Sequence, residues 1–222
     1  FLAMAPNFSG IVNQAIASGD ATIIAHLDGL GPGSDMPSLV SRIYNGADLG
    51  DSPKLDGTDC WPVTEESLTD PALIESAKAT YSASSVAGNV WSSGGNATFE
   101  LFLPIFGFSV KLTIYEARFA MTLDPDHGGA TAGQIGGVLD TEEFVTEMMK
   151  AFASFDSSLC GSATADAIAN QIRQASDILK DGTQDPAQEC NAISIGLGFT
   201  MEQIGLGGIA PGAPPFADPC KP

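Results

Sequence analysis

The stretch ATFELFLPIFGFSVKLTIYEARFAMTLDPDHGGATAGQIGGVL, residues 97–139, is the most apolar and most β-favouring part of the chain. Its apolar side chains recur at every second residue, which is the period of a strand with one buried face. Turns are predicted from Pro104 to Gly107 and at DPDHGG, residues 124–129, because proline lacks a ladder donor and glycine tolerates positive φ. We therefore expect residues 97–139 to form the central sheet on which the remaining elements pack.

The alternation changes phase inside this stretch. The apolar positions are even-numbered between Val110 and Ile114 but odd-numbered between Ala117 and Leu123. A strand cannot change parity in this way without an extra residue. The sequence therefore predicts a β-bulge at residues 115–116.

Helical patterns occur before and after this stretch in the sequence. Apolar spacing predicts a short helix over residues 8–16 and another over residues 163–180. Between them, Asp140 and Glu143 form a capping box, which is followed by an apolar helical face over residues 144–155. Further strands are predicted at residues 22–27, 39–44, 82–93 and 193–199.

These patterns predict a mainly β fold with added helices, namely an antiparallel β-sandwich or jelly-roll-like domain with two or three α-helices packed at its side. A chain of 222 residues is long enough for one large core, so we interpret residues 1–222 as a single domain. Residues 205–222 are rich in glycine and proline and are predicted to form an extended C-terminal tail.

The chain is strongly acidic, with a formal net charge of −18 and only nine Lys and Arg residues. A nucleic-acid surface needs clustered cations to displace phosphate counterions, so this class of partner is excluded. The same shortage disfavours an anionic membrane surface, and no apolar run reaches the roughly 18 residues that a membrane span needs. We expect the acidity to serve solubility, with divalent-cation binding or a basic partner as the alternatives.

Cysteine usage indicates an oxidising compartment. An even number of widely spaced cysteines in an acidic chain rich in Ser, Thr and Gly suggests two disulfides, and no zinc-binding spacing occurs. Four cysteines allow three pairings. We expect Cys160 to pair with Cys190 across a helical segment, in which case Cys60 and Cys220 would hold the tail.

Two features suggest ligand binding. The acidic loop at residues 45–62 carries Asp48, Asp51, Asp56 and Asp59, and calcium takes six to eight oxygen ligands from such loops. A solvated loop without metal is the preferred interpretation. Trp91 or Trp61 could stack on a sugar ring if exposed, although a core tryptophan is the more common outcome.

No catalytic motif of defined spacing occurs in the chain. Glu100 and Glu116 lie on the polar side of the predicted sheet and could act as a carboxylate pair in glycoside cleavage, which requires a separation of about 5–9 Å. Our leading hypothesis is a non-catalytic binding or structural module of the cell envelope or exterior, as a subunit of a larger assembly. The alternatives are a calcium-assisted carbohydrate-binding domain and a glycan-active enzyme that uses the paired carboxylates.

Several stretches resemble known sequences. These are VWSSGG (residues 90–95), GVLDTEEF (137–144), SSLCGS (157–162) and QIRQASDILKDGTQDPAQEC (171–190). They are similar to uncharacterised exported and lipoprotein-type proteins of bacteria with large genomes. The resemblance covers the C-terminal two-thirds of the chain. It implies an envelope or secreted location, with other envelope or extracellular proteins or glycans as partners, and it implies no activity and no site residues.

Overall fold

The computed structural model describes residues 8–105, 108–215 and 217–220. The strands are β1 (Thr22–Asp28), β2 (Met36–Gly46), β3 (Cys60–Thr64), β4 (Ala79–Ala87), β5 (Val90–Ser92), β6 (Ala97–Ile105), β7 (Phe108–Leu123), β8 (Gly129–Asp140), β9 (Ala192–Glu202) and β10 (Gly205–Ala210). The helices are α1 (Phe8–Ser18), α2 (Thr141–Phe155) and α3 (Ala163–Arg173), with 3-10 turns η1 (Glu65–Ser67) and η2 (Ser157–Leu159).

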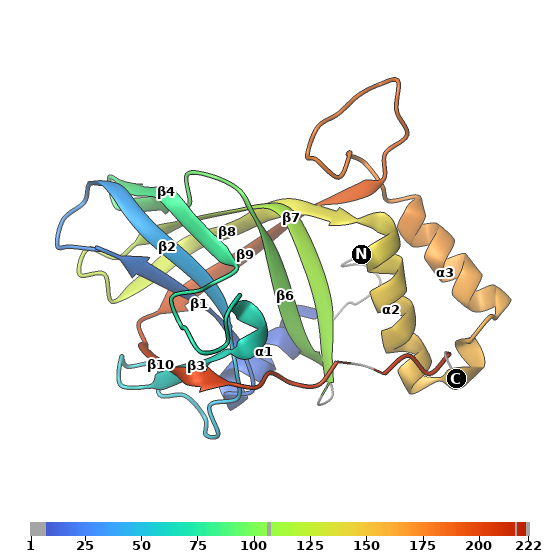
Figure 1. Cartoon of the computed structure of the whole chain (residues 1–222), viewed down its shortest axis with the longest axis horizontal. Helices are drawn as coiled ribbons and strands as arrows, with labels where there is room; N and C mark the ends of the chain where they lie inside the picture. Colours follow the sequence, from blue (N-terminus) through green and yellow to red (C-terminus); the bar gives the residue numbers. More distant parts are fainter. Residues whose placement is uncertain (1–7, 106–107, 216, 221–222) are drawn as a thin grey trace.

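All the described strands belong to one large, mostly antiparallel sheet. Its order is β10-β3-β2-β4-β5-β7-β8-β9, with β1 on β2 and β6 on β7, and only β10 and β3 are parallel. Helices α2 and α3 lie side by side at one end of the sheet (Figure 1). The predicted class, mainly β with added helices, is confirmed. No helix in the described residues is both long enough and apolar enough to cross a membrane.

The predicted central sheet is formed by β6, β7 and β8, and the predicted bulge is confirmed. Ala97 is opposite Ala117 while Phe99 is opposite Ile114, so β7 has one residue more than β6 over this interval. The register between β7 and β8 shifts at the same place. Glu116 takes a positive φ of 53°, which lets the strand absorb the extra residue.

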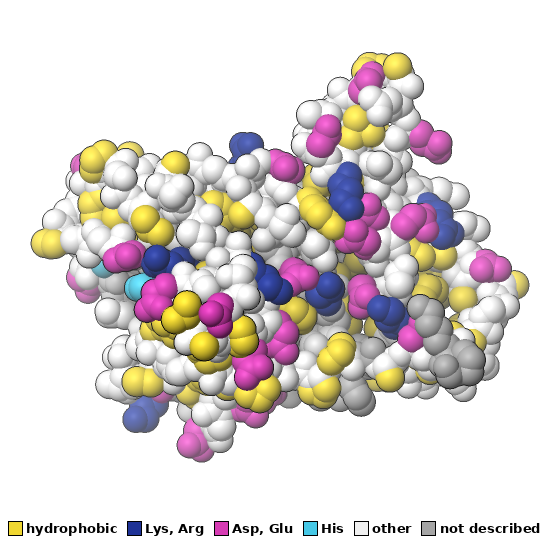
Figure 2. Space-filling view, in the orientation of Figure 1, with side chains coloured by type: hydrophobic (Ala, Val, Ile, Leu, Met, Phe, Trp, Pro, Cys, Tyr) yellow, Lys and Arg dark blue, Asp and Glu magenta, His cyan; other side chains and the backbone are white. Residues whose placement is uncertain are grey.

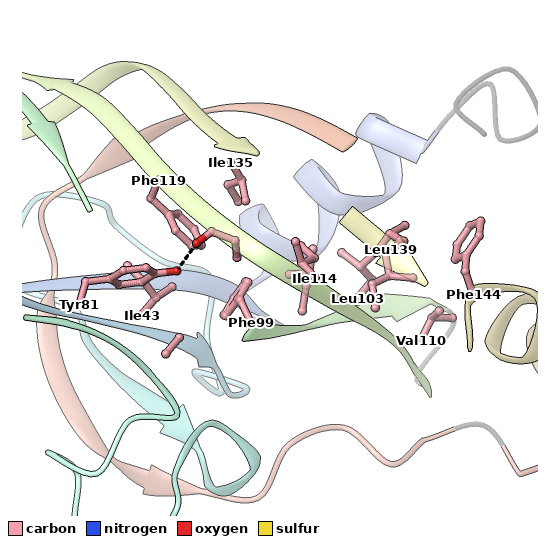
Figure 3. Packing of buried hydrophobic residues seen from close by; sticks show 14 of the residues in the cluster. Ile43, Tyr81, Phe99, Leu103, Val110, Ile114, Phe119, Ile135, Leu139 and Phe144 are labelled. Carbon is pink, nitrogen blue, oxygen red and sulfur yellow. Dashed lines mark hydrogen bonds between the residues drawn. The ribbon is translucent and has the colours of Figure 1, made fainter. Parts of the chain in front are cut away.

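The main core is formed by the inward side chains of the curved sheet (Figure 3). Phe119 of β7 makes edge-to-face contacts with Tyr81 and Phe99 at centroid distances of 5.9 and 5.5 Å. The Tyr81 hydroxyl donates a hydrogen bond of 2.9 Å to the carbonyl oxygen of Ala117. Burial raises the pKa of this hydroxyl, which therefore stays protonated and joins β4 to β7.

Three predicted elements are shorter than expected. The strand predicted at residues 82–93 is a hairpin, because Gly88 and Asn89 have positive φ and turn the chain between β4 and β5. The helix predicted at residues 163–180 ends at Arg173, because the following residues leave it to form a bridge between Ile178 and Ala192. The turn predicted at residues 104–107 is also shortened, since β6 continues to residue 105, and its remaining residues lie outside the described ones.

The predicted C-terminal tail begins as a strand. Gly205 and Leu206 pair with Cys60 and Trp61, which makes β10 part of the sheet. Residues 211–215 and 217–220 then form an extended segment, which we call the C-terminal strap. It runs from β10 past the end of the β6–β7 hairpin toward the end of α2 (Figure 1).

The strap ends in the disulfide, and the expected cysteine pairing is corrected. Cys220 is bonded to Cys160, whereas Cys60 and Cys190 are free thiols. The strap reaches Cys160 because Ser109 donates its backbone N–H to the Pro214 carbonyl oxygen. Cys190 is the last residue of the protruding loop 181–190, and Cys60 begins β3, where it pairs with Gly205 at the start of β10.

Candidate functional site

A groove of about 360 Å³ lies between β7 and α2. Its apolar lining consists of Leu112, Leu139 and Phe144, all of which are buried. Its polar lining consists of Lys111, Thr113, Asp140, Glu142, Glu143, Thr146 and Glu147. The volume falls within the range of about 300–1,000 Å³ that is typical of small-ligand sites.

Strand alternation and a helix cap place these side chains. On β7, Leu112 is buried while Lys111 and Thr113 are half-exposed beside the helix. Asp140 ends β8 and caps α2, since its carboxylate accepts the backbone N–H groups of Glu142 and Glu143 at 3.0 Å each. The N-terminal turn of α2 is therefore fixed against β7, and this arrangement forms the groove.

The predicted capping box is only half formed. The carboxylate of Glu143 accepts a hydrogen bond of 2.8 Å from the Tyr115 hydroxyl instead of reaching back to the helix start. Lys180 lies 2.9 Å from Glu143 and 3.1 Å from Asp140, with its ammonium 4.1 Å from the centre of the Tyr115 ring. Burial alone would lower the pKa of Lys180, but its bonds to Glu143, Tyr115 and Asp140 raise it. Lys180 therefore stays charged and ties the loop after α3 to the start of α2.

Two further ion-pair groups border the groove. The carboxylate of Glu100 lies 3.0 Å from Lys78 and 3.1 Å from Lys111. Burial alone would raise the pKa of Glu100, yet the hydrogen bonds from these two lysines lower it. Glu142 receives two hydrogen bonds from the guanidinium of Arg173, at 2.6 and 2.8 Å, and these lower the pKa of Glu142.

The ion pairs of the described residues gather around the groove, whose own charged lining is one cation, Lys111, and four carboxylates. Six of the seven ion pairs in the described part of the chain lie here, and they join five cations to five carboxylates. The chain as a whole carries a net charge of −18. In Figure 2, dark blue side chains lie beside magenta ones across the middle of this face. The cations are Lys78, Lys111, Lys150, Arg173 and Lys180, and the carboxylates are Glu100, Asp140, Glu142, Glu143 and Glu147.

The aspartates of the acidic loop bond to their own loop. Asp48 accepts the backbone N–H of Gly50, and Asp56 accepts that of Thr58. Asp59 accepts two backbone N–H groups, from Lys54 and Leu55. These are turn-forming contacts of short polar side chains. Among the described residues, no group of three or more His, Cys, Asp or Glu side chains is arranged to hold a metal ion, so neither these aspartates nor Asp51 gain support as calcium ligands.

The two tryptophans lie in the core. Trp61 is 1% exposed and Trp91 is 0% exposed. Their indole N–H groups donate to the Ala47 carbonyl oxygen at 2.6 Å and to the Ser41 hydroxyl at 3.1 Å. The sugar-stacking hypothesis is corrected accordingly, because neither ring presents a face to solvent.

The proposed catalytic pair does not line the groove. Glu100 lies on β6 between two lysines that keep it ionised, which does not suit a general acid. Glu116 occupies the bulge, with its side chain beside Gly182. The sequence analysis did not identify Tyr115, Lys180 or Arg173 as part of the site. They contact Glu142 and Glu143 from distant parts of the chain, and the only local signals were the parity of β7 and the helix cap.

Comparison of this chain with protein-family models, with curated proteins and with solved structures finds no match. The function is therefore argued from the geometry of the groove and its surroundings.

The ion pairs predict a loss of stability in acid. The folded pKa values of Glu100, Asp140 and Glu142 lie below the usual values of 4.5, 3.8 and 4.5. The stability that these three ionised carboxylates contribute is fully present above their usual pKa values. It is lost as the pH falls through their lower folded pKa values. We expect the free energy of unfolding, measured with urea, to fall as the pH drops below about 4.5. The fall should be shallower in Glu100→Gln and unchanged in the loop variant Glu189→Gln. Equal slopes in the unmodified protein and both variants would contradict the assignment of this stability to the ion pairs.

Proposed function

We propose that this chain is a non-catalytic binding module of the cell exterior or envelope, and that its ligand occupies the groove between β7 and α2. The observation that carries the proposal is the balanced set of five cations and five carboxylates around a groove of about 360 Å³, in a chain of net charge −18. A mainly solubilising distribution of charge would not gather five of the nine cations around one groove, with Lys111 in its lining.

The chemistry of the groove favours a neutral, hydroxyl-rich ligand such as a glycan. Lys111 supplies donors, Glu147 supplies acceptors, and the hydroxyls of Thr113 and Thr146 serve as either. A charged ligand would have to displace an existing ion-pair partner, whereas a sugar hydroxyl can bond to a carboxylate that keeps its lysine. The buried floor of Leu112 and Phe144 suits the apolar face of a sugar ring.

The proposed location rests on the disulfide between Cys160 and Cys220 and on the resemblance to exported proteins. Disulfides of this kind persist in oxidising compartments. Membership of a larger assembly, with envelope or extracellular proteins as partners, is part of the same proposal. The calcium-assisted alternative has less support, because the loop aspartates are engaged in turns and both tryptophans are buried.

The test is a titration of the folded, oxidised protein with maltotetraose and with chitotetraose at millimolar concentration, followed by amide chemical shifts. We expect shifts confined to residues 111–113 and 140–147 with at least one of the two sugars. Thr113→Val should weaken binding about three- to tenfold, because it removes one hydrogen bond while keeping the shape of the side chain.

The matched control is Thr122→Val, the same substitution on the same strand. Thr122 is exposed and pairs with Val90 and Thr131, away from the groove. This variant should bind as the unmodified protein does. Absence of shifts with both sugars, or equal weakening by the two variants, would rule out the groove as a glycan site.

A further inference from the structure

The outer edge of β9 has no strand beside it over most of its length. On its inner side β9 pairs with β8 from Ala192 to Glu202, and it ends the strand order of the sheet. On its outer side the described residues provide one bridge, between Ala192 and Ile178, and Asp177 then bonds to Ser194. From residue 195 to residue 202 the outer backbone groups have no ladder partner among the described residues.

This edge lacks the features by which proteins prevent unwanted strand pairing. No charged residue and no proline occurs from Ile195 to Met201. The bulge at this place is in β8, where Ala132 has a positive φ, so β9 itself stays regular. On the outward face, a side chain at Gly196 would meet no atom within 4 Å. This glycine therefore leaves the exposed face of β9 open beside the edge.

The inward face of β9 is apolar and only partly covered. Ile195, Leu197, Phe199 and Met201 pack against the main core yet remain half-buried. An added strand with apolar residues at alternate positions would cover these side chains and form the missing hydrogen bonds. Both gains need an extended partner.

The charges at the two ends of the edge indicate which partner fits. Asp177 lies at one end, and Glu202 lies at the other, where it and Asp124 flank Gly129. A second copy of this chain would bring two molecules of net charge −18 together, which opposes pairing between copies. A segment with cationic ends would instead be attracted.

We propose that the outer edge of β9, residues 195–202, accepts an extended segment of another protein as an added β-strand, and that this segment has alternating apolar side chains between terminal Lys or Arg residues. This surface is separate from the groove between β7 and α2. A failed sugar titration would therefore not contradict the proposed strand addition at β9. A failed peptide experiment would likewise not contradict the proposed ligand site in the groove.

The probe is the capped peptide Lys-Val-Thr-Val-Thr-Val-Lys, and the measurement is amide hydrogen exchange of the full oxidised chain. We expect the exchange of the outward amides within residues 195–202 to slow at least about tenfold at saturation. A Glu-flanked peptide of the same core should bind more weakly. A peptide with methylated backbone nitrogens should have no effect, because it cannot donate ladder hydrogen bonds.

Two lysine variants test the position. Thr200→Lys adds a positive charge at the edge, which repels the lysines of the peptide. It should weaken binding of the Lys-flanked peptide about fivefold. Thr131→Lys, at an exposed position on the neighbouring strand β8, should not. The proposal is overturned if the Lys-flanked peptide gives no slowing, if the methylated peptide slows exchange equally, or if protection of residues 195–202 rises with protein concentration alone, which would mean that a second copy occupies the edge.

Discussion

Replacing both Cys160 and Cys220 with serine is expected to lower the free energy of unfolding by about 4 kcal/mol. The bond closes a loop with a sequence separation of 60 residues, and the entropy that such a link removes from the unfolded chain grows with loop length. Because the bond also holds the strap at the end of α2, we expect exchange of the α2 amides to rise. Urea unfolding and amide exchange measure the two effects.

The matched control is the double variant Cys60→Ser and Cys190→Ser. Both residues are free thiols, so we expect a change within about 0.5 kcal/mol. If this control lost as much stability as the first variant, the assigned pairing would be wrong.

Phe119→Ala is expected to destabilise the fold by about 3–5 kcal/mol. Phe119 is 2% exposed and lies between Tyr81 and Phe99, so its removal leaves a cavity at the junction of β4, β6 and β7. Thermal or urea unfolding measures the loss. Phe155→Ala provides the control, since that side chain is 57% exposed at the end of α2, and we expect a change of about 0.5 kcal/mol or less. A loss below 1 kcal/mol for Phe119→Ala would show that the core is not packed as described.

The parts of the fold that depend on local pattern could be predicted. The parity change along β7 predicted the bulge at Tyr115 and Glu116 because a strand has a strict period of two. The helix start was predictable from Asp140, whose carboxylate meets N–H groups only two and three residues away. In both cases the interacting residues are close in sequence.

The parts that depend on distant partners could not be predicted. Cys160 and Cys220 meet only because the strap passes the end of the β6–β7 hairpin, and no sequence pattern encodes that path. Lys180 reaches Glu143 across 37 residues because the chain leaves α3 early and turns back. The ion pairs around the groove follow from such contacts, so neither composition nor motif spacing could reveal them.

The strap also connects the disulfide to the candidate site. α2 forms one wall of the groove, its first turn is fixed by Asp140 and Lys180, and its last turn contacts the strap through the Ser154 hydroxyl and the Ala217 carbonyl oxygen. These contacts hold both ends of the helix that forms this wall. The binding proposal therefore depends on the oxidised bond.

Peptide mapping by mass spectrometry of the native protein under non-reducing conditions tests the central claim most directly. We predict one cross-linked peptide that joins Cys160 to Cys220, with Cys60 and Cys190 both alkylated. A cross-link between Cys160 and Cys190, or alkylation of all four thiols, would contradict the strap, and with it the proposed location and the groove that the strap supports.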